Sequence, residues 1–371
     1  MRKQKLYWLI CIMWGVLSVH SQTNDKTRTF TYQNPISNGI DSNGLRDCQV
    51  LRDGDSWYMT GTAYPHWTEE AKKAPYKGVP LYKSSDLLNW TFVDYLVSPD
   101  TDYWYSERFW APEIQLINGK YYCLFNCTND ALGYLALHAG YAVADKIEGP
   151  YRVVTKETPL VRGNDLTFYQ DEDKTIWAFW RFDYGYGMGY AQVDLGKGVL
   201  CSEVREAIPA GKVDFLRDEQ GEYLLKEHYD GSMVKQIAKC YEWDSAGIEG
   251  AYVIKHNNKY YLFYSSWTNG YDIGYAVADR MTGPWVKSED NPIYGSSTRP
   301  EDLSKDEEMP YSAVGHNAIF KGPDGNYWLS CHGIIKGKKP FLVMDSISFD
   351  KNGKIHSKGP TSTIQTIPVP R

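Results

Sequence analysis

Five ionisable side chains stand at similar places along the chain, and their types are those that acid–base chemistry uses. They lie at or near the starts of five repeated segments: Asp47, Glu113, Asp165, Glu249 and His316. If the segments fold alike, four carboxylates and one imidazole converge on one pocket. Like charges brought together in this way raise one another's pKa values, and packing offers little reason for such an arrangement. The pattern therefore indicates a functional site.

Hydrolysis of a glycosidic bond is the reaction that suits this set. The reaction needs one protonated carboxylic acid at the leaving oxygen and one ionised carboxylate that acts on water or on the anomeric carbon. A third carboxylate close to the acid keeps it protonated near neutral pH by electrostatic repulsion. The repeat names the candidates and leaves their individual roles open.

The segments that must position these residues share one plan, which is an ionisable residue, an apolar strand, a polar turn and an aromatic strand. Their turns have the composition of tight hairpins, for example Asn118-Gly119 and Asp324-Gly325. The second strand opens with an aromatic residue and usually with a pair, as at Tyr121-Tyr122 and Tyr260-Tyr261. The five segments cover residues 47–62, 110–127, 164–180, 249–266 and 315–332.

The spacing of the segments predicts the fold. Successive starts lie 66, 52, 84 and 67 residues apart, which accommodates two hairpins with their loops, or one four-stranded propeller blade. We predict an all-β protein, a five-bladed β-propeller, in which residues 22–371 form a single catalytic domain. A β-sandwich is the structural alternative, but it does not explain five like-spaced units. The aromatic content of 15% excludes intrinsic disorder.

The N-terminus predicts export. Residues 1–21 combine three basic residues, an apolar run from Leu6 to Val19 and a cleavage site before Gln22, which is typical of a signal peptide. A short membrane anchor is the alternative, and no other stretch is apolar enough to span a bilayer. Removal of residues 1–21 changes the formal charge from −6 to −9, which argues against a nucleic-acid partner. We expect a periplasmic or extracellular protein.

Six cysteines follow the predicted signal peptide, and their spacing matches no zinc-binding pattern. Cys123 and Cys127 fall four apart in a probable strand, too far along it to form a disulfide with each other. We expect these six cysteines to be buried free thiols.

The motifs resemble glycoside hydrolase family 43, the five-bladed propeller hydrolases of arabinan, xylan and related side chains. The similarity covers nearly the whole mature chain. The segments that carry it are LRDCQVLRDGDSWYMTGT, SSDLLNW, WAPEI, NDLTFYQDED, IEGAYVIKHNNKYYLFYSS and GHNAIF.

The resemblance implies a role for three carboxylates. Asp47 matches the general base that activates water, Glu249 the general acid, and Asp165 the residue that tunes and orients that acid. The family inverts anomeric configuration, so the carboxyl groups of Asp47 and Glu249 are expected roughly 6.5–9.5 Å apart. Cys48 and Leu166 stand where the family often has proline, which suggests a less typical subfamily.

Other residues are candidates for binding. We expect Arg108, Phe109, Trp110 and Glu113 to contact substrate, although Glu113 fits a structural role equally well. Trp67 and Trp104 are candidate sugar platforms, and Arg181 and Arg299 are candidate anchors for hydroxyl or carboxylate groups. Each of these has an alternative reading in packing or in surface ion pairs.

No cofactor is expected to be required. By resemblance, His316 is a candidate ligand of a structural Ca²⁺ in the channel, and the alternative is a histidine bonded to water or to Glu113. The expected partner is an oligo- or polysaccharide that carries α-L-arabinofuranose or β-D-xylose. A galactan- or galactofuranose-directed hydrolase and an inactive glycan-binding propeller are the rival functions. Sugar identity, endo or exo action and oligomeric state stay open.

Overall fold

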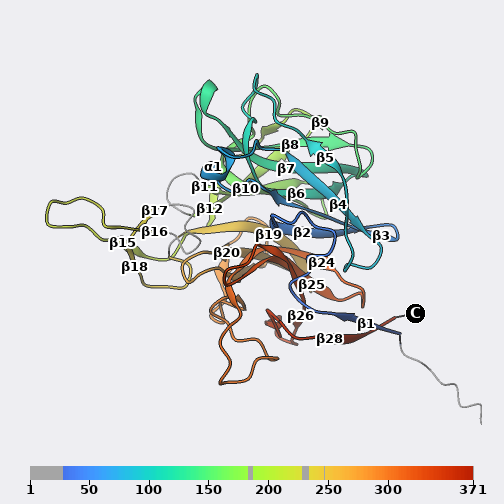
Figure 1. The fold of residues 1–371 in the computed structure, drawn as a ribbon. Helices are drawn as coiled ribbons and strands as arrows, with labels where there is room; N and C mark the ends of the chain where they lie inside the picture. Colours follow the sequence, from blue (N-terminus) through green and yellow to red (C-terminus); the bar gives the residue numbers. More distant parts are fainter. Residues whose placement is uncertain (1–27, 183–186, 228–233, 246, 371) are drawn as a thin grey trace, which may run out of the picture.

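Five antiparallel β-units follow one another along the chain, and each forms one blade of a propeller (Figure 1). The second and third units are joined by strand pairing into one nine-stranded sheet. The computed structural model describes residues 28–370 except 183–186, 228–233 and 246, so the predicted signal peptide at 1–21 lies outside the described residues. Blade 1 contains β2 (Leu45–Asp53), β3 (Ser56–Ala63), β4 (Val79–Ser84) and β5 (Thr91–Val97). Blade 2 contains β6 (Glu107–Ile117), β7 (Lys120–Asn129), β8 (Tyr134–Ala144) and β9 (Arg152–Val153).

The next three blades repeat this order. Blade 3 contains β10 (Val161–Gln170), β11 (Ile176–Phe182) and β12 (Met188–Asp194), with β13 (Val199–Leu200) and β14 (Arg205–Ile208) both pairing with β12. Blade 4 contains β19 (Ile248–His256), β20 (Lys259–Ser266) and β21 (Asp272–Ala278), with β22 (Val286–Lys287) and β23 (Tyr294–Gly295) both on β21. Blade 5 contains β24 (Tyr311–Lys321), β25 (Tyr327–Ile335), β26 (Phe341–Phe349) and β27 (Ile355–Ser357).

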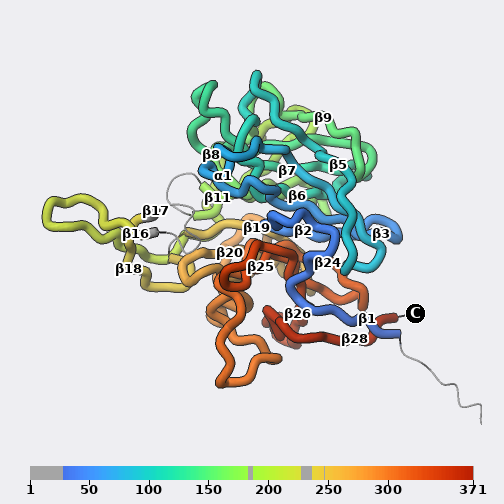
Figure 2. The backbone as a smooth tube through the Cα atoms, in the orientation of Figure 1, coloured from blue at the N-terminus to red at the C-terminus, as the bar shows by residue number. Residues whose placement is uncertain are grey.

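Segments outside the blades tie the ends of the chain together and form one projecting arm. Strand β1 (Arg28–Tyr32) pairs with β28 (Gln365–Val369) beside blade 5 (Figure 1). The arm extends away from the blades between β14 and β19 (Figure 2). Its two strand pairs are β15 (Val213–Phe215) with β18 (Ala238–Cys240) and β16 (Leu225–Glu227) with β17 (Val234–Gln236).

Helical structure is limited to α1 (Thr68–Ala71) and the 3₁₀ turn η1 (Asp130–Leu132) within the described part of the chain. Over the same residues, no helix has the length and apolar character needed to cross a membrane.

The aromatic pairs that open the second strands hold neighbouring blades together. Adjacent strand residues point to opposite faces of a sheet, so Tyr121 packs in the core between blades 1 and 2 while Tyr122 packs between blades 2 and 3. Likewise, Trp57 faces blade 5 and Tyr58 faces blade 2. Five such cores occur, one between each pair of neighbours, including blades 5 and 1. The predicted five-bladed propeller is confirmed.

The cysteines agree with the prediction in part. All six are free, and Cys48, Cys123, Cys127 and Cys331 are buried. Cys201 is exposed and Cys240 is half-buried, because both belong to short outer segments that have no neighbouring blade to cover them. The expectation of burial was wrong for these two.

Candidate active site

Each inner strand contains a β-bulge at the same place, and the bulges build the site. In every blade two residues of the inner strand oppose one residue of the second strand, and the first of the two has a left-handed backbone. A bulge of this kind bends the strand and redirects a side chain. The left-handed residues are Asp47 (φ 53°), Ala111 (φ 42°), Asp165 (φ 58°), Gly250 (φ 65°) and His316 (φ 61°).

This register corrects the expectation that all five ionisable residues are equivalent. Asp47, Asp165 and His316 occupy the same bulge position, and Asp and His tolerate its left-handed backbone better than most residues. Glu249 lies one residue before the bulge position of its blade, and Glu113 lies two residues after it. Counting along the sequence does not reveal these offsets, because the loops between the segments differ in length.

Bulging leaves a backbone N–H without a ladder partner, and the preceding blade in the ring supplies an acceptor. The acceptor is a second-strand residue of that preceding blade. It pairs with the inner-strand residue that comes just before the bulge of the same blade. Thr62 accepts from Ala111 N–H at 2.7 Å, Asn126 from Asp165 N–H at 3.0 Å, Ser265 from His316 N–H at 3.0 Å, and His332 Nδ1 from Asp47 N–H at 3.0 Å.

Blade 3 is the exception in this ring of hydrogen bonds. Arg181 stands at its acceptor position, and a guanidinium group has no acceptor atom. The N–H of Gly250 is bonded instead to Asp165 Oδ2 at 3.0 Å. Asp165 therefore holds the backbone immediately after Glu249.

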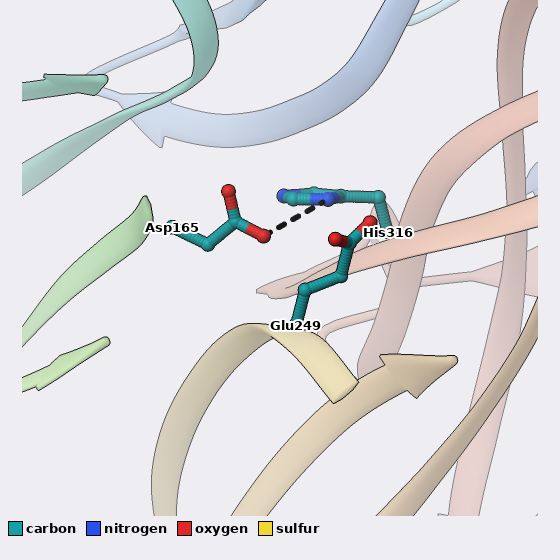
Figure 3. A group of neighbouring side chains, drawn as sticks. All are labelled: Asp165, Glu249 and His316. Carbon is teal, nitrogen blue, oxygen red and sulfur yellow. Dashed lines mark ion pairs between the residues drawn. The ribbon is translucent and has the colours of Figure 1, made fainter. Parts of the chain in front are cut away.

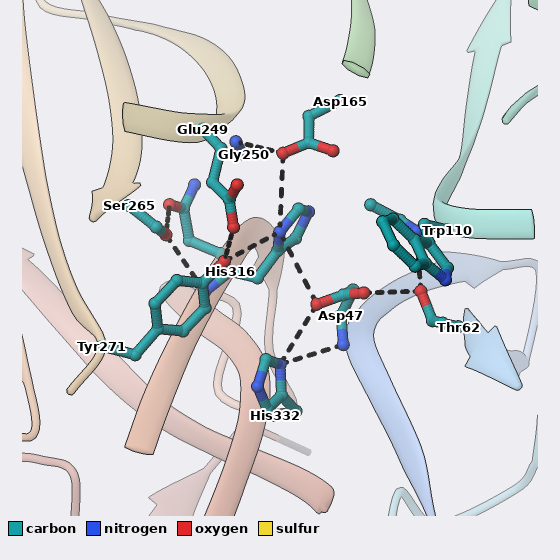
Figure 4. A network of polar contacts seen from close by, with 12 residues as sticks. Asp47, Thr62, Trp110, Asp165, Glu249, Gly250, Ser265, Tyr271, His316 and His332 are labelled. Carbon is teal, nitrogen blue, oxygen red and sulfur yellow. Dashed lines mark hydrogen bonds and ion pairs between the residues drawn. The ribbon is translucent and has the colours of Figure 1, made fainter. Parts of the chain in front are cut away.

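The bulges line one pocket with a cavity of about 270 Å³. Asp47, Asp165, Glu249 and His316 all line it, and Figure 3 shows the side chains of the last three pointing toward one another. His316 Nδ1 lies 3.6 Å from Asp47 Oδ1 and 3.9 Å from Asp165 Oδ2. Figure 4 shows the imidazole between the carboxyl groups of Asp47 and Glu249. The sequence-predicted acid–base residues are thus brought together around one histidine.

Asp47 is held in its ionised form. Burial on its own raises the pKa of Asp47, but the positive charge of His316 and hydrogen bonding outweigh it, so the pKa lies well below the ordinary value of 3.8. Thr62 Oγ1 donates to Asp47 Oδ2 at 2.5 Å. Its carboxylate is therefore fixed and negatively charged near neutral pH.

Asp165 is shifted in the opposite direction. Burial is the main cause that raises the pKa of Asp165 to about 6, and the nearby charges of Glu249 and Asp47 add to it. Asn126 Nδ2 donates to its Oδ1 at 3.2 Å. Two aspartates at the same bulge position of different blades thus have separated pKa values, which is typical of sites that divide acid and base work.

Glu249 is held by residues that the sequence motifs did not single out. Tyr271 donates its hydroxyl proton to Oε1, and Trp267 Nε1 donates to Oε2 at 3.3 Å. Arg181, a predicted anchor for substrate groups, lies 3.9 Å from Oε2 and lines the pocket. Trp267 and Tyr271 follow the strand that pairs with β19. Their position just after the fourth aromatic strand was the sequence feature that could have identified them as site residues.

His316 and its partners do not fit a calcium ion. Burial lowers the pKa of His316, but Asp47, Asp165, Glu249 and Glu113 together raise it above 6.5, which favours the protonated imidazole. Calcium prefers six to eight oxygen ligands. Asp165, Glu249 and His316 are within 4.8 Å of one another through one atom each, and this set supplies a nitrogen and only two carboxylates.

Trp110 and Trp67 are the predicted aromatic residues that reach the pocket. Both line it, and their rings meet edge to face with centroids 5.6 Å apart. Trp110 Nε1 is buried and has no hydrogen-bond partner among the described residues. A sugar hydroxyl would satisfy this donor.

Several other predicted binding residues lie away from the pocket. Phe109 is 3% exposed and packs between blades 1 and 2, where Trp104 is stacked on Phe125. Arg108 pairs with Asp130 at 3.6 Å and does not line the pocket. β6 has a second register shift between Glu107 and Trp110, so simple alternation could not place these side chains.

Glu113 and Arg299 also have local partners. Thr167 Oγ1 and Gln115 Nε2 donate to Glu113 Oε2 at 2.7 and 2.9 Å, and Glu113 does not line the pocket. Burial is the main cause that raises the pKa of Glu113 to about 7. Arg299 donates to backbone carbonyls of its own loop, at Ser304 and Glu307.

Comparison with known proteins agrees with this architecture. Residues 32–213 and 220–355 match the model of glycosyl hydrolases family 43. An extracellular endo-α-(1→5)-L-arabinanase of Bacillus subtilis is 32% identical over 97 residues, which cover 24% of this chain and 27% of the relative. A β-xylosidase of Xylanibacter ruminicola is 28% identical over 194 residues, which cover 49% and 57% of the two chains.

The solved structure of a thermostable family-43 glycoside hydrolase superposes with a TM-score of 0.66 at 25% identity, over 92% of this chain and 99% of that one. The matches to the two relatives above span only 27% and 57% of their own lengths, whereas the family model matches most of this chain. This chain therefore belongs to glycosyl hydrolases family 43.

Proposed function

We propose that this chain is a glycoside hydrolase that cleaves α-L-arabinofuranosyl or β-D-xylosyl bonds in polysaccharide side chains or oligosaccharides, with inversion of configuration. One observation carries the proposal. Three carboxyl groups from three blades meet in one pocket, with the pKa of Asp47 lowered and that of Asp165 raised. Such a separation serves acid–base chemistry and has no evident use in a binding module.

Asp47 is the proposed general base. Its carboxylate stays ionised beside His316 and takes a proton from a water molecule as that water attacks the anomeric carbon. The bond from the anomeric carbon to the leaving oxygen breaks in the same step. The electron pair of that bond goes to the leaving oxygen, and Asp47 ends the step protonated.

Glu249 is the proposed general acid and gives its proton to the leaving oxygen. It lies on the other side of His316 from Asp47 (Figure 4), as two groups that act on opposite faces of one sugar must. Asp165 is a positioning residue, because it holds the Gly250 N–H next to Glu249 and places a second carboxyl group near the acid. We assign no step to a metal ion.

Two further features belong to the proposal. We propose that residues 22–371 act as one catalytic domain and that residues 1–21 direct export, in line with the extracellular arabinanases among the relatives. The relatives include an arabinanase and a β-xylosidase, so the sugar is given as these two alternatives.

A panel of p-nitrophenyl glycosides tests the function. We expect release of p-nitrophenol from the α-L-arabinofuranoside or the β-D-xyloside, and its loss in Asp47→Asn and Glu249→Gln. Turnover of a galactofuranoside alone would favour the galactan-directed alternative. Binding without turnover on every sugar, natural oligosaccharides included, would leave a glycan-binding propeller.

A further inference from the structure

A second pocket adjoins the proposed active site and has a different electrostatic character. It has a cavity of about 430 Å³ and shares Arg46, His66 and Trp67 with the first pocket. These three residues form the wall between the two cavities. Arg46 lies over the Trp67 ring, with its guanidinium carbon 4.8 Å from the ring centroid. A glycan that occupied both cavities would pass over this wall.

Basic side chains from two distant parts of the chain gather around the second pocket. Lys73 follows α1, and Lys338 and Lys339 lie in the turn between β25 and β26. All three are exposed, and none forms an ion pair with a residue that the structure describes. With Arg46, the pocket has four cationic groups along its lining.

The two acidic residues of this pocket are already engaged. Glu69 forms an ion pair at 2.6 Å with Lys72, and Lys72 does not line the pocket. Glu70 Oε2 accepts the backbone N–H groups of His66 at 2.8 Å and Trp67 at 3.3 Å, at the start of α1. The lining has these four cationic groups against two carboxylates, which leaves a net charge of +2 around the pocket.

His66 supplies an independent sign that a ligand binds here. Its side chain is 5% exposed, and its Nε2 has no hydrogen-bond partner among the described residues. A buried polar atom without a partner is costly, and a ligand group can remove that cost. Burial lowers the pKa of His66 to about 3, so the ring is neutral and can pair with a sugar hydroxyl.

We propose that the second pocket is a subsite for a carboxylate-bearing sugar, a uronic acid unit next to the glycosidic bond that the enzyme cleaves. Lys338, Lys339 and Lys73 attract its carboxylate, Trp67 and the Arg46 stacked on it form the wall beside its ring, and His66 bonds a hydroxyl group. The proposal rests on the hydrolase function, because it places the uronate on the same glycan as the reacting sugar. The subsite would select acidic polysaccharides over neutral ones.

Binding measurements test the subsite without requiring turnover. The probes are glucuronic acid linked to xylobiose, trigalacturonic acid, and the methyl ester of each, which keeps the shape and removes the charge. We expect the full-length protein to bind one acid about tenfold more tightly than its ester by calorimetry, and the preference to shrink as salt is raised. The first probe represents a uronate branch and the second a uronate backbone, so the preferred pair identifies the source.

Matched variants locate the effect. In Lys338→Gln/Lys339→Gln we expect the acid-to-ester preference to fall to nearly one. Lys336→Gln is the control, because Lys336 is exposed in the same turn and does not line the pocket, and it should keep the preference. Equal affinity for acid and ester in the wild type, or an equal loss in the control, would overturn the subsite. Failure of hydrolysis on the aryl glycosides would instead overturn the proposed function, so the two failures are separable.

Discussion

Buried carboxyl groups occur at two neighbouring layers of the inner strands, which are the bulge positions and the positions two residues beyond them. Only the layer of the bulge positions opens to the pocket. Asp165, on the bulge, has its pKa raised to about 6, and Glu113, two residues beyond the bulge of its blade, has its pKa raised to about 7. Burial is the main cause in both. A raised pKa therefore does not separate a functional carboxyl group from a structural one.

The surroundings of the two carboxyl groups do separate them. Glu113 is bonded to Thr167 and Gln115 and does not reach the cavity. Asp165 faces the charged groups Glu249 and His316 inside the pocket. A polar group next to uncharged donors stabilises the fold, whereas charges gathered at a cavity store energy that substrate binding can use.

Removal of the base is the change with the largest expected effect. Asp47→Asn keeps the shape and the bond from Thr62 but cannot take a proton from water. We expect kcat to fall about 10²–10⁴-fold on the aryl glycoside that the wild type cleaves. In Glu113→Gln we expect kcat to stay within about tenfold of the wild type, because Glu113 is outside the pocket. Similar losses in the two variants would contradict the distinction between the layers.

Removal of the acid should have an effect that depends on the leaving group. Glu249→Gln cannot protonate the leaving oxygen, so we expect a loss of about 10²–10⁴-fold on natural oligosaccharides. A dinitrophenolate leaves without proton assistance, and the loss on its glycoside should be much smaller. Steady-state kinetics on both substrates measures the ratio. Equal losses on both substrates would remove Glu249 from the role of acid.

The structural carboxyl group should be visible in stability. Because the pKa of Glu113 is raised from 4.5 to about 7, the folded protein binds a proton between these values that the unfolded chain has lost. The titration of Glu113 should therefore lower the free energy of unfolding of the wild type by about 3 kcal/mol as pH rises through that range.

Glu113→Gln lacks this titration. As pH rises, its free energy of unfolding should therefore increase by that amount relative to the wild type. Urea denaturation of both proteins at pH 4.5 and pH 8 measures the difference. A difference that does not change with pH would show that Glu113 is not held protonated in the folded protein.

A smaller effect is expected from the histidine between the carboxyl groups. His316→Gln removes the positive charge that lowers the pKa of Asp47, so the base will be protonated at higher pH. We expect the acid limb of the kcat/KM profile to move up by about 1–3 pH units. Ser265→Ala removes the acceptor of the His316 N–H and the hydrogen bond to Asn317 Oδ1 but no charge, and it should leave that limb in place. An unmoved limb in His316→Gln would assign the low pKa of Asp47 to another group.

The parts of the fold that repeat could be predicted from the sequence. Tyr121-Tyr122 and Trp57-Tyr58 indicated the second strands, and their alternation explains why each pair joins two neighbouring cores. The bulges could not be read in the same way. An extra residue shifts the register without any change in residue type, so Glu249 and Glu113 looked equivalent to Asp47 although neither is.

Some of the residues that support the site lie within the repeated segments of the sequence, and others do not. Thr62 and His332 end the first and fifth repeated segments, and the structure shows that they accept bulge N–H groups of a neighbouring blade. Tyr271, by contrast, comes from a loop outside the repeats, and its contact with Glu249 depends on how that loop folds back. Such contacts are set by tertiary packing and have no local pattern.

The configuration of the first product tests the central claim most directly. If Asp47 directs water to one face of the sugar while Glu249 protonates the leaving oxygen on the other, the anomer released first is opposite to that of the substrate. Proton NMR in the first minutes of hydrolysis, before mutarotation, distinguishes the two anomers. We predict the inverted anomer. Release of the retained anomer would mean a covalent intermediate and would contradict the roles given to Asp47 and Glu249.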